Sequence, residues 1–264
     1  MAKQTLDKTT RDAIKNARNL IEEAFRADRN EAGTRRRVER IFESIMGYDP
    51  FKHLTREKAV RGAGETEHVD FAIQLEEGEE VKPAIFIELK RVGIDLAKKH
   101  LKQVVSYAID AGCEWVILTN GREWRLHHVE FGRPPQIKQI LTWDLLEDEI
   151  KEIAECFSVI HYKNVKRGGL DELWKKMNVL KADNVLNAIL CEDSLRLLRR
   201  KLKGDTNVLV SHEDIVSSIG RLLNESALDE MGKIKITLPE RKPRTTRRKP
   251  KTSESESEAK PTAE

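Results

Sequence analysis

The sequence is poor in cysteine and has no long apolar run. Its three cysteines, Cys113, Cys156 and Cys191, are widely spaced and include no Cys-x-x-Cys pair. This pattern predicts neither a disulfide framework nor a zinc site, and it fits a reducing cytoplasm. No stretch approaches the roughly 18 apolar residues that a membrane span needs, and Met-Ala-Lys-Gln is not a signal sequence. We therefore expect a cytoplasmic protein that does not contact a membrane.

The chain also lacks a strong overall charge. The formal net charge of +3 comes from the last residues, because residues 241–264 hold eight basic and four acidic side chains. Residues 1–240 carry a net charge of −1. Any affinity of the folded part for nucleic acid must therefore come from a local basic patch and not from a global field.

Two neighbouring segments, residues 69–75 and 84–90, alternate in the period-2 manner of strands with one buried face. The polar connector between them contains Gly78 and Pro83 and predicts a hairpin loop. Val69, Phe71, Ile73 and Leu75 should share one side of the first strand, with Asp70 on the other. In the second strand, Glu88 and Lys90 should lie on the side opposite to Ile85, Ile87 and Leu89.

Pairing these strands brings Asp70, Glu88 and Lys90 to one face of the sheet. One interpretation is a solvated sheet surface, since 35% of the residues are charged. The other is a metal site. Two close carboxylates raise each other's pKa unless they share a cation, and carboxylate oxygens suit Mg²⁺. Lys90 could then position or help deprotonate an attacking water. This second interpretation predicts a metal-dependent phosphodiester hydrolase.

The flanking segments predict a mixed sheet covered by helices. Apolar residues recur at helical spacing in residues 7–27, 31–46 and 95–111, and Glu31 falls near the apolar stripe of the second helix. Strands are expected at residues 57–61, 114–119, 123–131 and 137–143, and Asn120-Gly121 is a strong hairpin signal. A helix between the strands at 84–90 and 114–119 favours a parallel crossover. The fold class is therefore α/β or α+β.

The rest of the chain, residues 147–264, has a different composition. Residues 147–238 show repeated helical spacing, including a Ser211–Asp214 capping box. Residues 239–264 are rich in Pro, Thr, Ser, Lys and Glu and cannot form a core. We expect a nuclease-like domain at 1–146, a helical region at 147–238 and a disordered basic and acidic tail at 239–264.

The order of these motifs resembles a known family. Asn30-Glu31-Ala-Gly-Thr34-Arg35, Val69-Asp70-Phe71, Ile87-Glu88-Leu89-Lys90, Gln103-Val-Val-Ser-Tyr107 and Leu118-Thr-Asn-Gly121-Arg-Glu-Trp124 follow one another over roughly residues 30–130. Together they resemble the N-terminal nuclease domain of type I restriction enzyme restriction subunits, in the PD-(D/E)XK superfamily of restriction-endonuclease-like folds. We expect a stand-alone form of this domain.

The resemblance also implies roles for individual residues. Asp70 and Glu88 would bind the catalytic metal, Mg²⁺ or Mn²⁺, Lys90 would serve the water, and Glu31 would be the helix-borne acid near the metal. Gln103 and Tyr107 would match the Gln-x-x-x-Tyr element, for handling DNA. The chain departs from the family in lacking a Gly-x-x-x-x-Gly-Lys-Ser/Thr loop, so ATP-driven translocation is not supported. Val69 replaces the proline that names the superfamily.

Three functions follow as hypotheses. The first is a Mg²⁺-dependent DNA endonuclease in restriction or defence, expected to be a homodimer because cutting both strands needs two active sites. The second is a catalytically silent nuclease-fold module that binds DNA or a partner protein. The third is an RNA or repair nuclease of the same fold.

Overall fold

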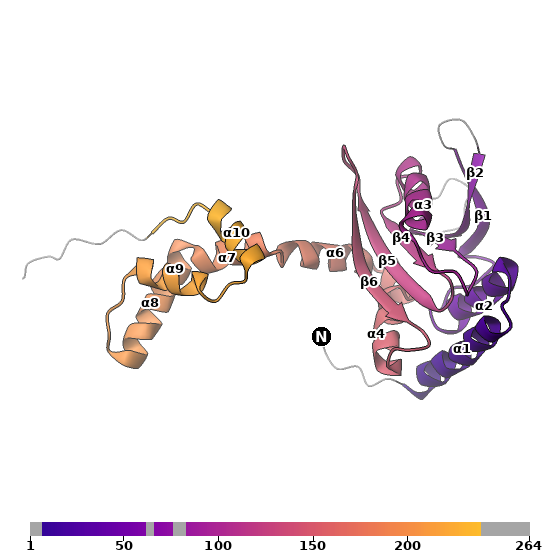
Figure 1. Ribbon diagram of the computed structural model, residues 1–264, viewed down its shortest axis with the longest axis horizontal. Coiled ribbons are helices and arrows are strands. Elements are labelled where there is room, and N and C mark those ends of the chain that lie inside the picture. Colours follow the sequence, from indigo (N-terminus) through magenta and orange to yellow (C-terminus); the bar gives the residue numbers. More distant parts are fainter. Residues whose placement is uncertain (1–6, 62–65, 76–82, 239–264) are drawn as a thin grey trace, which may run out of the picture. The chain divides into compact units, whose positions relative to one another are not determined.

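The computed structural model describes residues 7–61, 66–75 and 83–238. The connector expected at 76–83 lies largely outside these ranges, and a turn expected at Gly62–Gly64 before the Asp70 strand and the tail at 239–264 lie wholly outside them. The chain divides into two compact units, Met1–Asn178 and Val179–Glu264. The first contains the whole sheet (Figure 1). In the described residues, no helix has both the length and the apolar character to cross a membrane.

The first unit is a six-stranded mixed sheet with helices on both faces, as the sequence predicted. The strands lie in the order β1-β2-β3-β4-β5-β6, and β3 and β4 are parallel whereas every other neighbouring pair is antiparallel. The elements are α1 Lys8–Arg26, α2 Glu31–Ser44, β1 Leu54–Arg61, β2 Thr66–Ile73, β3 Ile85–Leu89, α3 Lys98–Asp110, β4 Trp115–Thr119, β5 Glu123–Glu130, β6 Gln136–Asp144, α4 Ile150–Val159, α5 Tyr162–Lys166 and α6 Gly169–Val179.

Alternating strand residues separate two cores, one on each face of the sheet. Ile85, Ile87 and Leu89 belong to the larger core, which also takes residues from α1, α2 and α4. Phe86 belongs to the smaller core, under α3. Each face therefore buries one set of β3 side chains, and this explains why all five residues of β3 are buried.

The first unit extends beyond residue 146, where we expected the nuclease-like domain to end. Ile153 and Phe157 of α4 are fully enclosed in the larger core, and Leu170 of α6 is part of it. The hydroxyl of Tyr48 donates a hydrogen bond to the backbone oxygen of Ile160 at 2.8 Å. These contacts make helices α4 to α6 part of the same folded body as the sheet.

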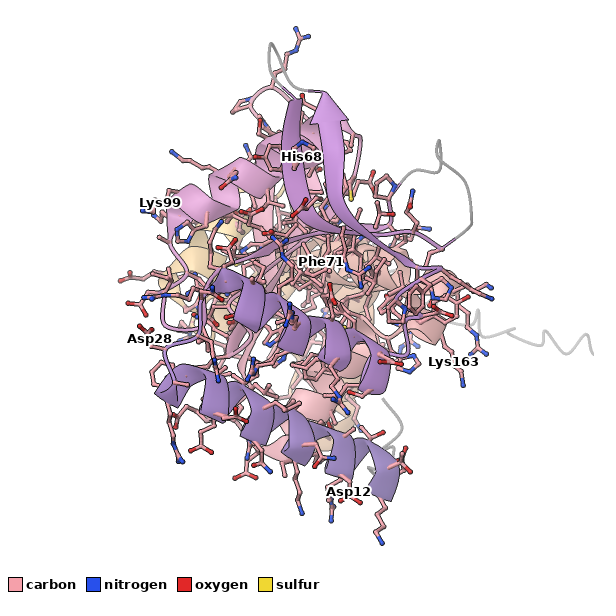
Figure 2. The ribbon with its side chains drawn as sticks, turned by 90° about the vertical axis from the view of Figure 1, so that its right-hand side faces the viewer. Asp12, Asp28, His68, Phe71, Lys99 and Lys163 are labelled. Atoms are coloured by element: carbon pink, nitrogen blue, oxygen red, sulfur yellow. The ribbon has the colours of Figure 1, made fainter. Side chains whose placement is uncertain are left out.

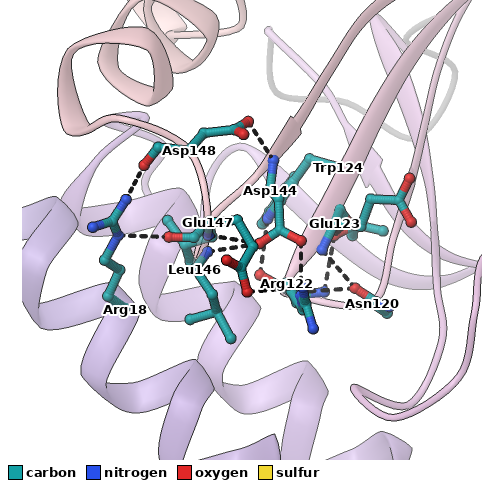
Figure 3. Close-up of polar contacts among 12 residues, drawn as sticks. Arg18, Asn120, Arg122, Glu123, Trp124, Asp144, Leu146, Glu147 and Asp148 are labelled. Atoms are coloured by element: carbon teal, nitrogen blue, oxygen red, sulfur yellow. Dashed lines mark hydrogen bonds and ion pairs between the residues drawn. The ribbon is translucent and has the colours of Figure 1, made fainter.

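The turn between β4 and β5 is held against the end of β6 by polar contacts (Figure 3). Asn120 Oδ1 accepts hydrogen bonds from the backbone N–H groups of Arg122 and Glu123. Arg122 Nε donates to Asp144 at 2.7 Å, and Arg18 of α1 binds the backbone oxygens of Leu145 and Asp148. The expected Asn-Gly hairpin is therefore tied to the end of β6, and the segment after β6 is tied to α1.

Gly121 allows this turn to approach the first two helices. Its φ is +85°, and an added Cβ would lie 2.9 Å from Cδ1 of Ile21 and 3.4 Å from the side chains of Thr34 and Val38. The first two helices and the β4–β5 turn, far apart in the sequence, thus meet at one glycine. This contact carries no chemistry but fixes where α2 begins relative to the sheet.

We expect Gly121→Ala to lower the free energy of unfolding by about 2 kcal/mol, since a side chain at positive φ is strained and Ile21 must move. Urea unfolding followed by tryptophan fluorescence measures this change. Gly132→Ala is the control, because its nearest neighbour would be the Pro134 oxygen at 3.4 Å. Equal stability of the two variants would contradict the close packing at Gly121.

The second unit is helical, as expected for this part of the chain. It contains α7 Ala182–Leu190, α8 Glu192–Thr206, α9 His212–Gly220 and α10 Glu225–Lys233. The predicted capping box is present, with Ser211 accepting from the Asp214 N–H and Asp214 accepting from the Ser211 N–H.

Candidate active site

Asp70 and Glu88 come from adjacent antiparallel strands. The ladder pairs Phe71 with Ile87 and Ala72 with Phe86, so Asp70 and Glu88 are in register just beyond its last pair. Asp70 Oδ2 accepts a hydrogen bond from the Leu89 N–H at 2.8 Å, and Asp70 acts electrostatically on Glu88. The two carboxylates thus lie near each other at the end of β3, as the sequence predicted.

The strand alternation is broken at Asp70, and one expectation fails there. Phe71 and Ile73 lie in the larger core, but Val69 packs in the smaller core with Phe86 and not beside them. The β1 residue that should face Asp70 is Glu57, which has a φ of +47° and is skipped in the ladder between Arg56–Phe71 and Lys58–Val69. The backbone of β1 is thus irregular at the point opposite Asp70, where the alternation of β2 is broken.

Glu88 is a buried carboxylate with a short contact to a cation. Only 2% of the residue is exposed, and Lys90 Nζ lies 2.6 Å from its Oε1. Burial raises the pKa of Glu88 to about 7, even though the hydrogen bond from Lys90 lowers it, and the charges of Asp70 and Glu31 raise it further. The negative charge of the ionised carboxylate is therefore incompletely compensated.

Lys90 is held beside this carboxylate at the end of β3. Its backbone N–H donates to the Thr119 oxygen at the end of the parallel strand β4. Burial lowers the pKa of its ammonium, but the hydrogen bond to Glu88 and the charges of Glu88, Glu31 and Asp70 raise it, and the net effect is an increase. Lys90 therefore stays protonated near neutral pH.

Glu31 is brought to the same site by the start of α2. Asn30 caps this helix by accepting from the Gly33 N–H at 2.9 Å, and Glu31 is the first helical residue. Its charge raises the pKa values of both Glu88 and Lys90, which places it near them. Figure 2 shows α1 and α2 running side by side, with Asp28 at their connection, Lys99 of α3 nearby in the view, and His68 and Phe71 on β2.

Arg35, one turn beyond Glu31, is a member of this group that the sequence prediction did not select. Its guanidinium is hydrogen bonded to Asp70 Oδ1, donates to Glu57 Oε1 at 2.9 Å and lies 4.0 Å from Glu31 Oε1. The i,i+4 spacing of Glu31 and Arg35 was the signal that could have identified it, since such residues share a helix face.

Gln103 and Tyr107 lie on α3, over the smaller core. Gln103 Nε2 donates to the Tyr107 hydroxyl at 3.0 Å. Tyr107 is buried whereas Gln103 is exposed. His100, one turn earlier, has its pKa lowered by burial and by the charges of Lys90 and Lys99, so the start of α3 borders the group around Lys90. Gln103 and Tyr107 are thus joined to each other, on a helix beside the carboxylates.

The donor set at this site is made of carboxylate oxygens, which is the chemistry that Mg²⁺ and Mn²⁺ prefer. Within residues 7–61, 66–75 and 83–238, no three His, Cys, Asp or Glu side chains are already gathered as ligands. Asp70 and Glu88 instead contact Arg35 and Lys90. The incompletely compensated charge on Glu88 fits a cation that would be shared with Asp70.

Comparison with known proteins identifies the segment that carries this site. Residues 30–141 match the family model described as type I restriction enzyme R protein N terminus. The comparison with curated proteins finds no significant match. Among solved structures, the cryo-EM structure of a DrdV–DNA complex is similar, with 13% sequence identity and a TM-score of 0.42; the match covers 74% of this chain and 17% of that chain.

Proposed function

We propose that this chain is a Mg²⁺-dependent DNA endonuclease that acts in restriction of foreign DNA, because residues 30–141 match the family model of type I restriction enzyme R protein N termini. Mn²⁺ is expected to replace Mg²⁺. The matched segment includes every residue of the candidate active site, from Glu31 to Tyr107.

The observation that carries the proposal is the buried carboxylate of Glu88 in contact with Lys90 at 2.6 Å and close to Asp70 and Glu31. A buried carboxylate whose pKa is raised to about 7 is costly to the fold. Groups with strongly shifted pKa values are concentrated at functional sites, where catalysis requires them. The same arrangement is hard to explain as a solvated sheet surface.

Asp70 and Glu88 would hold the metal, and Glu31 would add negative charge beside it. A bound Mg²⁺ would supply Lewis-acid polarisation of the phosphodiester and of a water. The ammonium of Lys90 would orient the attacking water and offset the charge that develops on the phosphorane. Gln103 and Tyr107, on a helix that borders the site, would contact the DNA.

A catalytically silent binding module is the second candidate, and a specific observation favours it. Asp70 and Glu88 already have cationic partners, Arg35 and Lys90, in direct contact. A fold that uses these ion pairs only for stability would have no need of a metal. Calorimetric titration distinguishes the two candidates, because only the endonuclease requires Mg²⁺ or Mn²⁺ binding that depends on Glu88.

The decisive experiment is the incubation of the full chain with supercoiled plasmid in Mg²⁺ and, separately, in EDTA. We expect nicked or linear DNA only with the metal, and none from an Asp70→Asn preparation purified in the same way. Equal cutting by both preparations would identify a contaminating nuclease and remove the assignment. Duplex DNA, single-stranded DNA and RNA of one sequence, tested in parallel, distinguish a DNA endonuclease from an RNA or repair nuclease.

Double-strand cleavage would require two active sites, so we propose that the active form on DNA is a homodimer. Sedimentation at the working concentration, with and without duplex DNA, measures the association state. A monomer under both conditions, together with double-strand breaks, would contradict this part of the proposal.

A further inference from the structure

Arg35 contacts three acidic residues, whereas Lys90 contacts one. Its guanidinium is within 4.0 Å of carboxylate oxygens from Asp70, Glu57 and Glu31. The side chain is largely enclosed, with 23% of its area exposed, and its Nε has no hydrogen-bond partner among the described residues. Arg35 is therefore a mostly enclosed cation that contacts three carboxylates.

The two oxygens of Asp70 have partners of different kinds. Oδ2 accepts from the backbone N–H of Leu89, which is fixed by the strand. Oδ1 is hydrogen bonded to the guanidinium of Arg35, which is at the end of a long side chain. A cation that binds Oδ1 of Asp70 can therefore displace Arg35, because only the arginine side chain has to move.

The net charge of the group can be balanced by one divalent cation. Asp70, Glu88, Glu31 and Glu57 supply four carboxylates, and Arg35 and Lys90 supply two cations, all linked by the contacts described above. Two negative charges remain without a counter-charge within this group when all four carboxylates are ionised. One dication would neutralise them.

Arg35 would also keep partners after leaving Asp70. Its Nη1 donates to Glu57 Oε1 at 2.9 Å, and its guanidinium carbon lies 5.9 Å from the centre of the Phe71 ring. A guanidinium over an aromatic face is attracted to it. The release of Asp70 would therefore not leave a buried charge without a counter-ion.

We infer that Arg35 is the internal counter-ion of the metal site and competes with the metal for Asp70. It would hold Asp70 in place before the metal binds and would set the metal concentration at which the site is filled. Arg35 is thus a positioning residue, which acts on the reaction through Asp70. This inference rests on the proposed metal site and adds to it a control of metal affinity.

The test is calorimetric titration of the full chain with Mn²⁺ and with Mg²⁺, comparing wild type with Arg35→Met. An adjacent arginine shifts the affinity of an aspartate for a proton by one to three orders of magnitude. We expect removal of this competing charge to tighten the dissociation constant for the metal by about tenfold. The melting temperature in EDTA should fall, because the carboxylates lose their counter-ion, and the metal should restore most of it.

Arg36→Met is the matched control, since Arg36 is an exposed residue on the same helix and its loss changes the net charge equally. Tightening in both variants would mean a general field effect and would overturn the inference, as would unchanged or weaker metal binding by a folded Arg35→Met. Arg35→Lys, which retains the charge, should bind metal within about threefold of wild type and covers the case in which Arg35→Met does not fold. Failure of the wild-type chain to bind either metal would instead overturn the metal site itself.

Discussion

Lys90→Met is expected to lower the rate constant of Mg²⁺-dependent plasmid cleavage by about a thousandfold. Methionine keeps most of the length of the side chain but removes the ammonium that contacts Glu88 at 2.6 Å. In the proposed mechanism this ammonium is the donor beside the developing phosphorane charge, and loss of one such donor costs roughly 10²–10³ in rate. Single-turnover cleavage with excess protein measures the chemical step apart from product release.

The control for this experiment is Lys99→Met, which removes an exposed lysine from α3, close to His100. We expect a change of less than about threefold in its cleavage rate, together with a weaker salt dependence of DNA binding if Lys99 contacts phosphate. A Lys90→Met rate within tenfold of wild type would contradict the assigned role of Lys90. The fluorescence of both variants before and after urea unfolding checks that they are folded.

Glu88→Gln is expected to stabilise the first unit by about 3 kcal/mol above pH 7 in EDTA. The pKa of Glu88 is about 7 in the folded chain, against an ordinary value of 4.5, and each pH unit of such a difference corresponds to about 1.4 kcal/mol. Because the folded state holds the proton more tightly, wild-type stability falls as the pH rises from about 4.5 to 7 and then stays level. Glutamine has no charge to bury.

The size of this gain should therefore depend on pH. It should be absent below about pH 4.5, grow through pH 5 and 6, and reach its full value above pH 7. The favourable contact with Lys90 is already included in this gain, because the pKa of about 7 contains the lowering effect of the Lys90 hydrogen bond and charge. Glu43→Gln, which changes an exposed carboxylate on α2, should alter the stability by less than about 0.5 kcal/mol at any pH.

Urea unfolding at pH 5, 6, 7 and 8 tests the prediction. The four tryptophans, at positions 115, 124, 143 and 174, all lie in the first unit, so fluorescence reports the unfolding of this unit. Added Mg²⁺ should narrow the difference, since a ligand that binds only the folded wild type stabilises it. If the Glu88→Gln chain is less stable than wild type at pH 8 in EDTA, the prediction is wrong and the ionised carboxylate stabilises the fold.

Much of the architecture could be predicted because it depends on local signals. Period-2 alternation identified β2 and β3, Asn120-Gly121 identified the β4–β5 hairpin, and the helix between residues 90 and 114 indicated the parallel pairing of β3 and β4. The proximity of Asp70, Glu88 and Lys90 followed from pairing two adjacent strands in sequence. Each of these inferences needs contacts over short stretches of chain only.

What could not be predicted depends on contacts between distant segments. The pairing of Arg35 with Asp70 joins a helix to a strand 35 residues later, and no sequence period encodes it. The positive φ of Glu57 is the conformation of a non-glycine residue that carries no turn signal, and the position of Val69 in the smaller core breaks the alternation of its own strand. Helical spacing in residues 150–159 predicted α4 but not the sheet on which it packs.

The hydroxyl of Thr34 gives the first turn of α2 a fixed length. It donates to the Asn30 oxygen and accepts from the Val92 N–H, two residues beyond Lys90, while its methyl group faces Gly121. An inserted residue between Glu31 and Thr34 would rotate the glutamate by about 100° around the helix axis and turn it away from Lys90. Chains that share this architecture should therefore tolerate changes of residue type in this turn far better than insertions or deletions.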